Sequence, residues 1–252
     1  MHRALLVAAS LGALAAVARA HVAPSMDDNN RYLKLTPLGD RVRLAYTVYF
    51  GEVPGAAARR EIDVDRDGAI SDAEAQAFGA ALAAQVRPAL AITVDGAAAP
   101  VAWTEIDVGM GTSVTAAGSF SVDLIAWLCL PQARGKHTVR VRDAFALPRP
   151  GETELHVEDT PGVHVEVARL GAIDLVDLDA RWQGAGGPLA HDGFTLAFDA
   201  GDKAPIPKDG ACAASAAPAA GGLSRGLWLG LAIAATLIMA AVSYVLIRRR
   251  AR

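Results

Sequence analysis

Oxygen-bearing side chains recur at a spacing that suits a divalent cation in residues 63–74, whose sequence is DVDRDGAISDAE. The first, third, fifth and twelfth positions are acidic, and the sixth is a glycine that permits a sharp backbone turn. Calcium is a hard ion that takes roughly six to eight oxygen ligands from carboxylates, carbonyls and hydroxyls. We therefore predict that Ca²⁺ binds here, with ligands from Asp63, Asp65, Asp67, the carbonyl of Ala69, Ser71 and Glu74.

The loop meets every position of the pattern D-x-[DN]-x-[DN]-G-x5-E, and it resembles the calcium loop of EF-hand proteins. That resemblance implies that Ile70, at position 8, anchors the loop to its neighbour. Ser71 and Glu74 also form a capping-box pattern, which predicts a helix from about Asp72. The alternative is an acidic capped turn that no longer binds calcium, but four carboxylates around one point repel each other unless a cation is present.

The flanks of the loop differ from those of EF-hand sensors. Only residues 54–62 are available for the entering helix, and Ala75 stands where EF-hand proteins usually have a large apolar residue. The sequence contains one such loop, whereas sensors generally use pairs. We therefore expect a structural ion, held at an extracytoplasmic affinity of about 10⁻⁴ to 10⁻³ M, rather than a calmodulin-like sensor.

Both ends of the chain predict export and membrane anchoring. Residues 1–20 have the basic start, apolar run and A-x-A site of a secretory signal peptide, so the mature chain would begin at His21. Residues 226–247 carry no charge over a length that spans a bilayer as a helix, and the basic tail 248–252 follows. We predict a single-pass membrane protein of a bacterial envelope, with its N-terminal domain on the extracytoplasmic, periplasmic side.

The exported part of the chain is acidic. The whole chain has a formal net charge of -3, with 24 basic and 27 acidic residues, but seven arginines lie in the predicted signal peptide or at the membrane edge. The remainder therefore has 17 basic residues and a net charge near -10. This charge argues against nucleic acid or anionic lipid as a partner and favours cations.

Residues 21–201 have the pattern of a β-rich domain. Apolar and polar residues alternate over residues 41–50, and short strand-like runs separated by Gly, Pro and Asp follow from residue 90 onwards. Residues 54–87 are rich in Ala, Glu and Arg, which predicts a helical insert that contains the loop. We expect a mainly β, antiparallel sandwich-like domain with an EF-hand-like insert between its second and third strands. Residues 202–225, rich in Ala, Pro and Gly, are predicted to form a linker to the membrane helix.

The two cysteines differ in their surroundings. Cys129 lies in an apolar strand-like run, and Cys212 lies in the predicted linker. An oxidising compartment permits a bridge between them without requiring it. We predict two unpaired thiols, with the bridge as the alternative.

The mature N-terminus suggests a second kind of metal site. An N-terminal histidine, here His21, can chelate copper through its amine and ring nitrogen if a further imidazole is available. His156 and His164 can meet across a hairpin turned at Pro161 and Gly162. The histidines that lie later in the chain and could complete such a site are His137, His156, His164 and His191.

The sequence offers no recognisable catalytic constellation. It contains no G-x-S-x-G, H-E-x-x-H or C-x-x-C motif, and its Gly-rich pieces lack the strand-to-helix setting of a phosphate site. We therefore predict a non-enzyme.

The order of features in residues 21–100 is similar to the extracytoplasmic region attached to some bacterial nickel/cobalt permeases. Those features are an Ala-His start, two strands, an acidic loop and the strand LAITVDG. One predicted membrane helix is too few for a permease, so the resemblance implies a role as a transporter's partner.

Two hypotheses about the function follow. The first is a membrane-anchored calcium-binding module that is structural or binds another envelope protein. The second is an accessory protein that uses His21 to handle nickel, cobalt or copper for a metal transporter.

Overall fold

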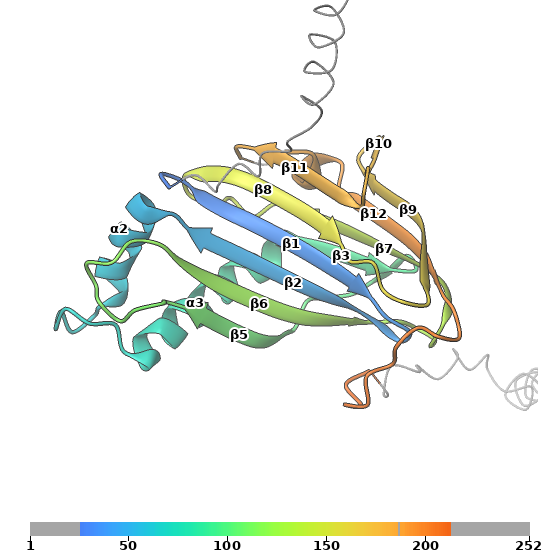
Figure 1. The fold of residues 1–252 in the computed structure, drawn as a ribbon, viewed down its shortest axis with the longest axis horizontal. Coiled ribbons are helices and arrows are strands. Elements are labelled where there is room, and N and C mark those ends of the chain that lie inside the picture. The colour runs from blue at the N-terminus through green and yellow to red at the C-terminus, as the bar shows by residue number, and fades with distance from the viewer. Residues whose placement is uncertain (1–25, 186, 213–252) are drawn as a thin grey trace, which may run out of the picture. The chain divides into compact units, whose positions relative to one another are not determined.

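The computed structural model of the protein describes residues 26–185 and 187–212, and these residues form two six-stranded sheets. The first sheet has the strand order β11-β8-β1-β2-β6-β5 (Figure 1). Its strands are β1 Asn29–Pro37, β2 Arg41–Phe50, β5 Trp103–Gly109, β6 Phe120–Cys129, β8 Pro150–Val157 and β11 Asp179–Gln183.

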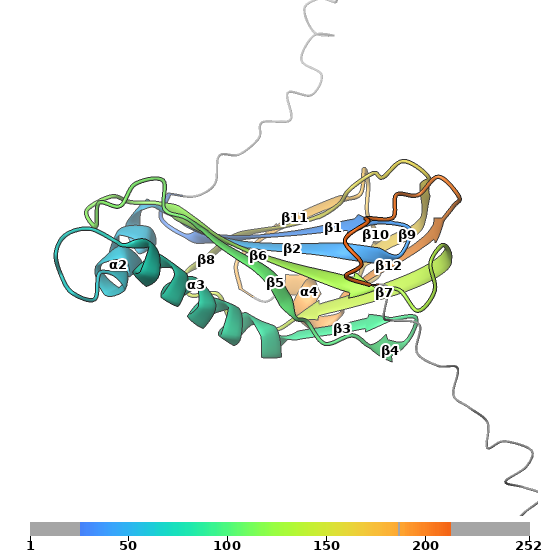
Figure 2. The ribbon, with the colours of Figure 1, turned by 90° about the horizontal axis from the view of Figure 1, so that it is seen from below.

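The second sheet has the strand order β10-β9-β12-β7-β3-β4. Figure 2 shows the two sheets stacked as layers, with β1, β2 and β6 in one layer and β7 and β3 in the other. The prediction of a mainly β protein is confirmed. The strands of the second sheet are β3 Leu90–Val94, β4 Ala97–Ala98, β7 Gly135–Asp143, β9 Val163–Leu170, β10 Ile173–Asp174 and β12 Phe194–Ala200.

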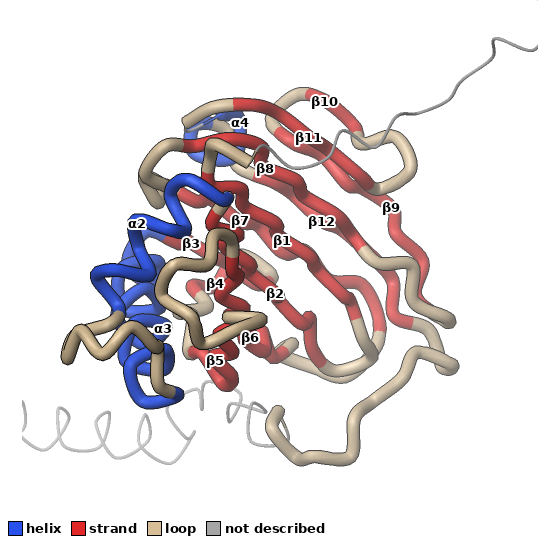
Figure 3. Tube along the Cα trace, turned by 60° about the vertical axis from the view of Figure 1, so that its left-hand side comes forward, coloured by secondary structure: helices blue, strands red, loops and turns tan. Residues whose placement is uncertain are grey.

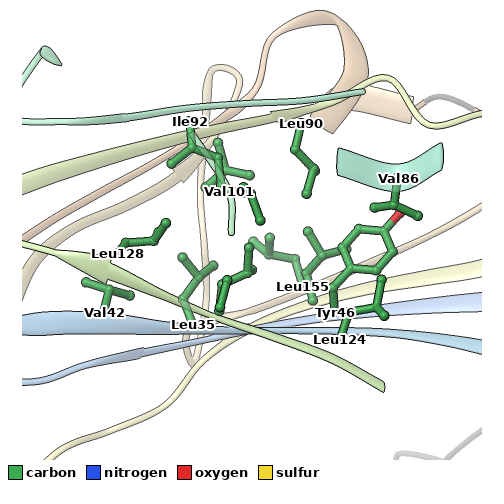
Figure 4. Close-up of a cluster of buried hydrophobic side chains, with 14 of the residues drawn as sticks. Leu35, Val42, Tyr46, Val86, Leu90, Ile92, Val101, Leu124, Leu128 and Leu155 are labelled. Carbon is green, nitrogen blue, oxygen red and sulfur yellow. The ribbon is translucent and has the colours of Figure 1, made fainter. Parts of the chain in front are cut away.

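Alternating side chains from both sheets fill one hydrophobic core. In β2, Leu44, Tyr46 and Val48 are fully buried, whereas the residues between them are only partly buried. Leu196 and Phe198 of β12 reach the same core from the second sheet. Figure 4 shows such side chains meeting between the layers. The period of two in the sequence therefore marks the inner faces of β2 and β12.

One strand pair departs from the antiparallel arrangement that we expected. β1 pairs with β8 in parallel, with Leu33 opposite Leu155, while the other pairs in both sheets are antiparallel. The chain leaves the second sheet after β7 and enters the first sheet as β8, so no tight turn sets the direction of this pair. The strands β5 and β11 were also not predicted. Neither contains a fully buried residue, and the apolar Ile106 and Val108 of β5 are only partly buried.

The helical insert lies between β2 and β3, as predicted. It comprises α2 Glu52–Ile62, α3 Asp72–Val86 and the short 3-10 helix η1 Arg87–Ala89. A further short helix, α4 Gly187–His191, precedes β12 and was not predicted. The entering helix α2 is longer than the predicted residues 54–62, because it begins at Glu52. Pro54 lies in the first turn of the helix, where proline is tolerated.

Helix α3 lies close against strand β5. A Cβ atom at Gly79 would stand 2.6 Å from a methyl carbon of Val108, so only glycine permits this approach. Trp103 donates its indole N–H to the carbonyl of Ala83 at 3.0 Å, which holds the other end of the helix to the same strand. The glycine that weakens helix propensity at this position therefore serves the packing of α3 on the first sheet.

A buried ion pair joins the two sheets. Arg31 of β1 lies 2.7 Å from Asp143 of β7, and their side chains are 3% and 0% exposed. Tyr46 donates its hydroxyl to the same Asp143 oxygen at 3.0 Å, and Arg31 also donates to Thr153 at 3.3 Å. Burial, with a smaller effect from the Asp143 carboxylate, raises the pKa of Tyr46 above its ordinary value, so this phenol stays protonated and remains a donor.

Several predicted segments lie outside the described residues. These are the signal peptide 1–20, linker residues 213–225, the membrane helix 226–247 and the tail 248–252. Within the ranges that the structure describes, no helix is both long and apolar enough to cross a membrane.

The compact unit runs past the predicted domain boundary at residue 201, as far as Pro207. Ala204 is buried in the core, and the backbone N–H of Gly39 donates to the carbonyl of Pro205 at 2.8 Å. The first residues of the predicted linker therefore pack on the turn between β1 and β2.

The prediction of two unpaired thiols is wrong. Cys129 and Cys212 are both disulfide-bonded. Sequence reasoning could not decide this, because pairing depends on which distant segments the fold brings together. A disulfide is compatible with the oxidising compartment that the N-terminal residues predict.

Removing the carboxylate of Asp143 should destabilise the protein strongly. Asp143→Ala leaves the Arg31 guanidinium buried without its counter-charge, and we expect the free energy of unfolding to fall by about 3–5 kcal/mol. Urea unfolding measures the change. The matched control is Asp174→Ala, which breaks the exposed Arg169–Asp174 pair and should move the urea midpoint little. Equal shifts in the two variants would contradict a special role for the buried pair.

Candidate metal site

The predicted metal-binding loop connects the end of α2 to the start of α3, at the end of the sheets where both helices lie (Figure 3). The backbone N–H of Asp63 donates to the carbonyl of Arg59 at 3.0 Å, so the first ligand position directly follows the last turn of α2. Ser71 caps α3 in the predicted capping box. Two helix ends therefore fix the two ends of the loop.

Three aspartates converge inside the loop. One carboxylate oxygen from each of Asp63, Asp65 and Asp67 lies within 4.8 Å of the others. Asp65 accepts from the N–H of Asp67 at 3.1 Å, and Asp67 accepts from the N–H of Ala69 at 2.8 Å. These local turns, with Gly68 at a φ of +90°, bend the chain around a common point. The aspartate triad could hold a metal ion.

The two oxygens of Asp63 have different surroundings. Oδ2 accepts hydrogen bonds from the N–H of Gly68 at 3.1 Å and from the hydroxyl of Thr115 at 2.9 Å. Oδ1 is buried and has no hydrogen-bond partner among the described residues, and the residue as a whole is only 6% exposed. A buried carboxylate oxygen without a donor carries a large desolvation penalty. A cation at the centre of the triad would remove that penalty.

Glu74, the predicted twelfth ligand, does not belong to the triad. One of its oxygens accepts from the N–H of Val64 at 2.7 Å, and the other accepts from the N–H and the hydroxyl of Ser71 at 2.9 and 2.8 Å. The Ser71 backbone bond, followed by the Ser71 hydroxyl and the Val64 bond, lowers the pKa of Glu74 below its ordinary value. Its carboxylate is therefore ionised at neutral pH, and it reaches across the loop to the residue that follows Asp63.

Residues 68–70 pair with a segment of the connection between β5 and β6. Ala69 forms an antiparallel bridge with Val114. The hydrogen bonds of this bridge run from the N–H of Ile70 to Ser113 at 2.7 Å and from the N–H of Thr115 to Gly68 at 3.1 Å. The carbonyl of Ala69, the predicted seventh-position ligand, is thus not used by the bridge. Ile70 is 5% exposed and lies in the core, which agrees with its predicted anchoring role.

Sequence reasoning missed Arg59, which organises this connection. Its side chain is fully buried and donates to five backbone carbonyls of residues 110–119. Burial lowers its pKa, while Glu52 opposes that change. In the sequence Arg59 is indistinguishable from its exposed neighbour Arg60. The acceptors are Met110, Thr112 at 2.9 Å, Val114 at 3.1 Å, Gly118 at 3.0 Å and Ser119 at 3.4 Å.

His156 and His164, which could have met across a hairpin, do not form a cross-strand pair. His156 lies in β8 of the first sheet and His164 in β9 of the second, so the two strands do not form a hairpin. The ring nitrogens of the buried His137 face Asp95 and the carbonyl of Arg134, each at 2.8 Å. Over the ranges that the structure covers, the aspartate triad is the one cluster of three or more potential metal-ligating side chains. His21 lies outside those ranges.

No protein-family model matches the chain, and no curated protein matches it. The geometry of the loop and its surroundings therefore carries the functional argument.

Loss of the Ser71 hydroxyl should weaken helix α3 in the metal-free protein. Ser71→Ala removes the side-chain half of the capping box, and we expect the free energy of unfolding to fall by about 1 kcal/mol. Chemical denaturation in the presence of a chelator measures this. Ser113→Ala is the control, because Ser113 is exposed and its hydroxyl makes no hydrogen bond within the described residues. The capping role would be contradicted if both variants lost the same stability.

Proposed function

We propose that this protein is an extracytoplasmic calcium-binding module in which one Ca²⁺ ion occupies residues 63–74. The observation that carries the proposal is the convergence of Asp63, Asp65 and Asp67, one carboxylate oxygen of each lying within 4.8 Å of the others, while Oδ1 of Asp63 is buried and has no hydrogen-bond partner among the described residues. This arrangement leaves one buried acceptor without a donor, which is the environment that a cation stabilises.

The chemistry of the ligands favours calcium over a transition metal. The proposed ligands are carboxylates, a backbone carbonyl and a hydroxyl, and hard oxygen ligands suit calcium, magnesium or manganese better than nickel or copper. The loop length and ligand positions match those of a calcium loop, whereas magnesium demands near-ideal octahedral geometry and usually keeps several waters. An extracytoplasmic site needs an affinity of only about 10⁻⁴ to 10⁻³ M.

The position of the loop supports a structural role for the ion. The loop joins the end of α2 to the start of α3, and α3 packs on β5 of the first sheet. A bound calcium ion would neutralise the acidic loop and so hold both helix ends and the β5–β6 connection together. Such a module acts by binding rather than by catalysis, and its natural partner is another protein of the bacterial envelope. We propose that residues 1–20 direct export and that residues 226–247 anchor the domain as a single-pass membrane protein.

Calcium should bind to and stabilise the full-length protein after chelator treatment. At a calcium concentration about a hundredfold above the dissociation constant, the free energy of unfolding should rise by about 2.7 kcal/mol. Titration calorimetry and thermal unfolding measure binding and stabilisation separately. Asp63→Asn and Glu74→Gln should abolish both responses. Asp72→Asn, which removes a neighbouring charge outside the ligand positions, should retain them.

The competing function gives a different result. A protein that handles nickel, cobalt or copper through its mature N-terminus would respond to one of those metals and lose the response in His21→Ala. That outcome, with no response to calcium, would overturn the calcium proposal.

A further inference from the structure

The β5–β6 connection pairs directly with the middle of the predicted metal-binding loop. Residues 113–115 pair with residues 68–70 through two backbone hydrogen bonds around the Ala69–Val114 bridge. The loop is therefore not isolated, because residues 113–115 of the β domain pair with it.

We propose that the β5–β6 connection, residues 110–119, is the second half of the metal site. Thr115 orients the first ligand toward the ion, and binding of the ion fixes the connection in turn. This inference rests on the proposed calcium function and adds residues that the loop pattern does not contain.

Thr115 acts as a positioning residue. Its hydroxyl donates to Oδ2 of Asp63 at 2.9 Å, and the N–H of Gly68 donates to the same oxygen at 3.1 Å. Two donors on Oδ2 fix the rotation of the carboxylate group and leave Oδ1 as the Asp63 oxygen without a donor among the described residues. Groups that orient metal ligands in this way affect affinity without touching the metal.

Arg59 links the connection to the same helix end. Its guanidinium binds backbone carbonyls on both sides of Thr115, including those of Val114 at 3.1 Å and Gly118 at 3.0 Å. Its own carbonyl accepts the N–H of Asp63 at 3.0 Å. The end of α2, the loop and the connection therefore form one hydrogen-bonded network, and Figure 1 shows the connection in green beside α2. Coupling through such a network must act in both directions.

The first experiment measures calcium affinity by titration calorimetry on full-length variants. Thr115→Val keeps the shape of the side chain but removes the donor, and it should weaken calcium binding on the order of tenfold. Thr115→Ser restores the hydroxyl and should restore the wild-type affinity. Thr195→Val makes the same change in β12 of the second sheet, where the hydroxyl makes no hydrogen bond among the described residues, and it should bind calcium as the wild type does.

The second experiment measures amide hydrogen exchange with and without calcium. Calcium should slow exchange at the amides of Ile70 and Thr115, whose hydrogen bonds join the two segments. Thr115→Val should show less slowing at the same calcium saturation. Glu74→Gln, which should not bind calcium, should show none.

The outcomes separate this inference from the proposed function. A wild-type protein that does not bind calcium refutes the function itself. Calcium binding with the same affinity and the same exchange pattern in Thr115→Val overturns only the role of the connection. If Thr115→Val does not fold, exchange in the wild type decides the matter, because unchanged exchange at Thr115 on calcium binding also overturns the inference.

Discussion

A fully buried guanidinium must find acceptors for its N–H groups, and at Arg59 this requirement shapes the whole end of the domain that carries the loop. The acceptors are backbone carbonyls of residues 110–119, a connection that has no regular structure of its own to satisfy them. The connection is therefore held against α2, and from there it pairs with residues 68–70. Because an unpaired buried charge is strongly destabilising, this arrangement has few alternatives.

The same requirement appears at the buried Arg31–Asp143 pair and at Asp63, with different outcomes. Arg31 and Asp143 meet across the core, and Tyr46 donates to the same carboxylate, so that this ion pair joins the two sheets. Asp63 is buried as well, yet one of its oxygens has no donor in the described part of the chain. The Arg31–Asp143 pair is neutralised within the protein, whereas the three loop aspartates form no salt bridge among the described residues, and a bound cation would supply their counter-charge.

The placement of the loop connects metal binding to the rest of the fold. Its two ends are the ends of helices, its middle pairs with a connection between two strands, and Ile70 is buried in the core. An ion held here would therefore act on the domain rather than on a free surface loop. This arrangement fits a module whose shape depends on calcium better than a sensor that opens a groove between two helices.

Local patterns were sufficient for the features that the sequence determined by itself. The spacing of the aspartates, the capping box at Ser71, the alternation in β2 and the position of the helical insert each depend on residues close together in the chain. The parallel pairing of β1 with β8 and the roles of Arg59 and Thr115 depend instead on contacts between distant segments. Only the tertiary structure decided these features, because a lone arginine or threonine carries no sequence signal for a partner more than fifty residues away.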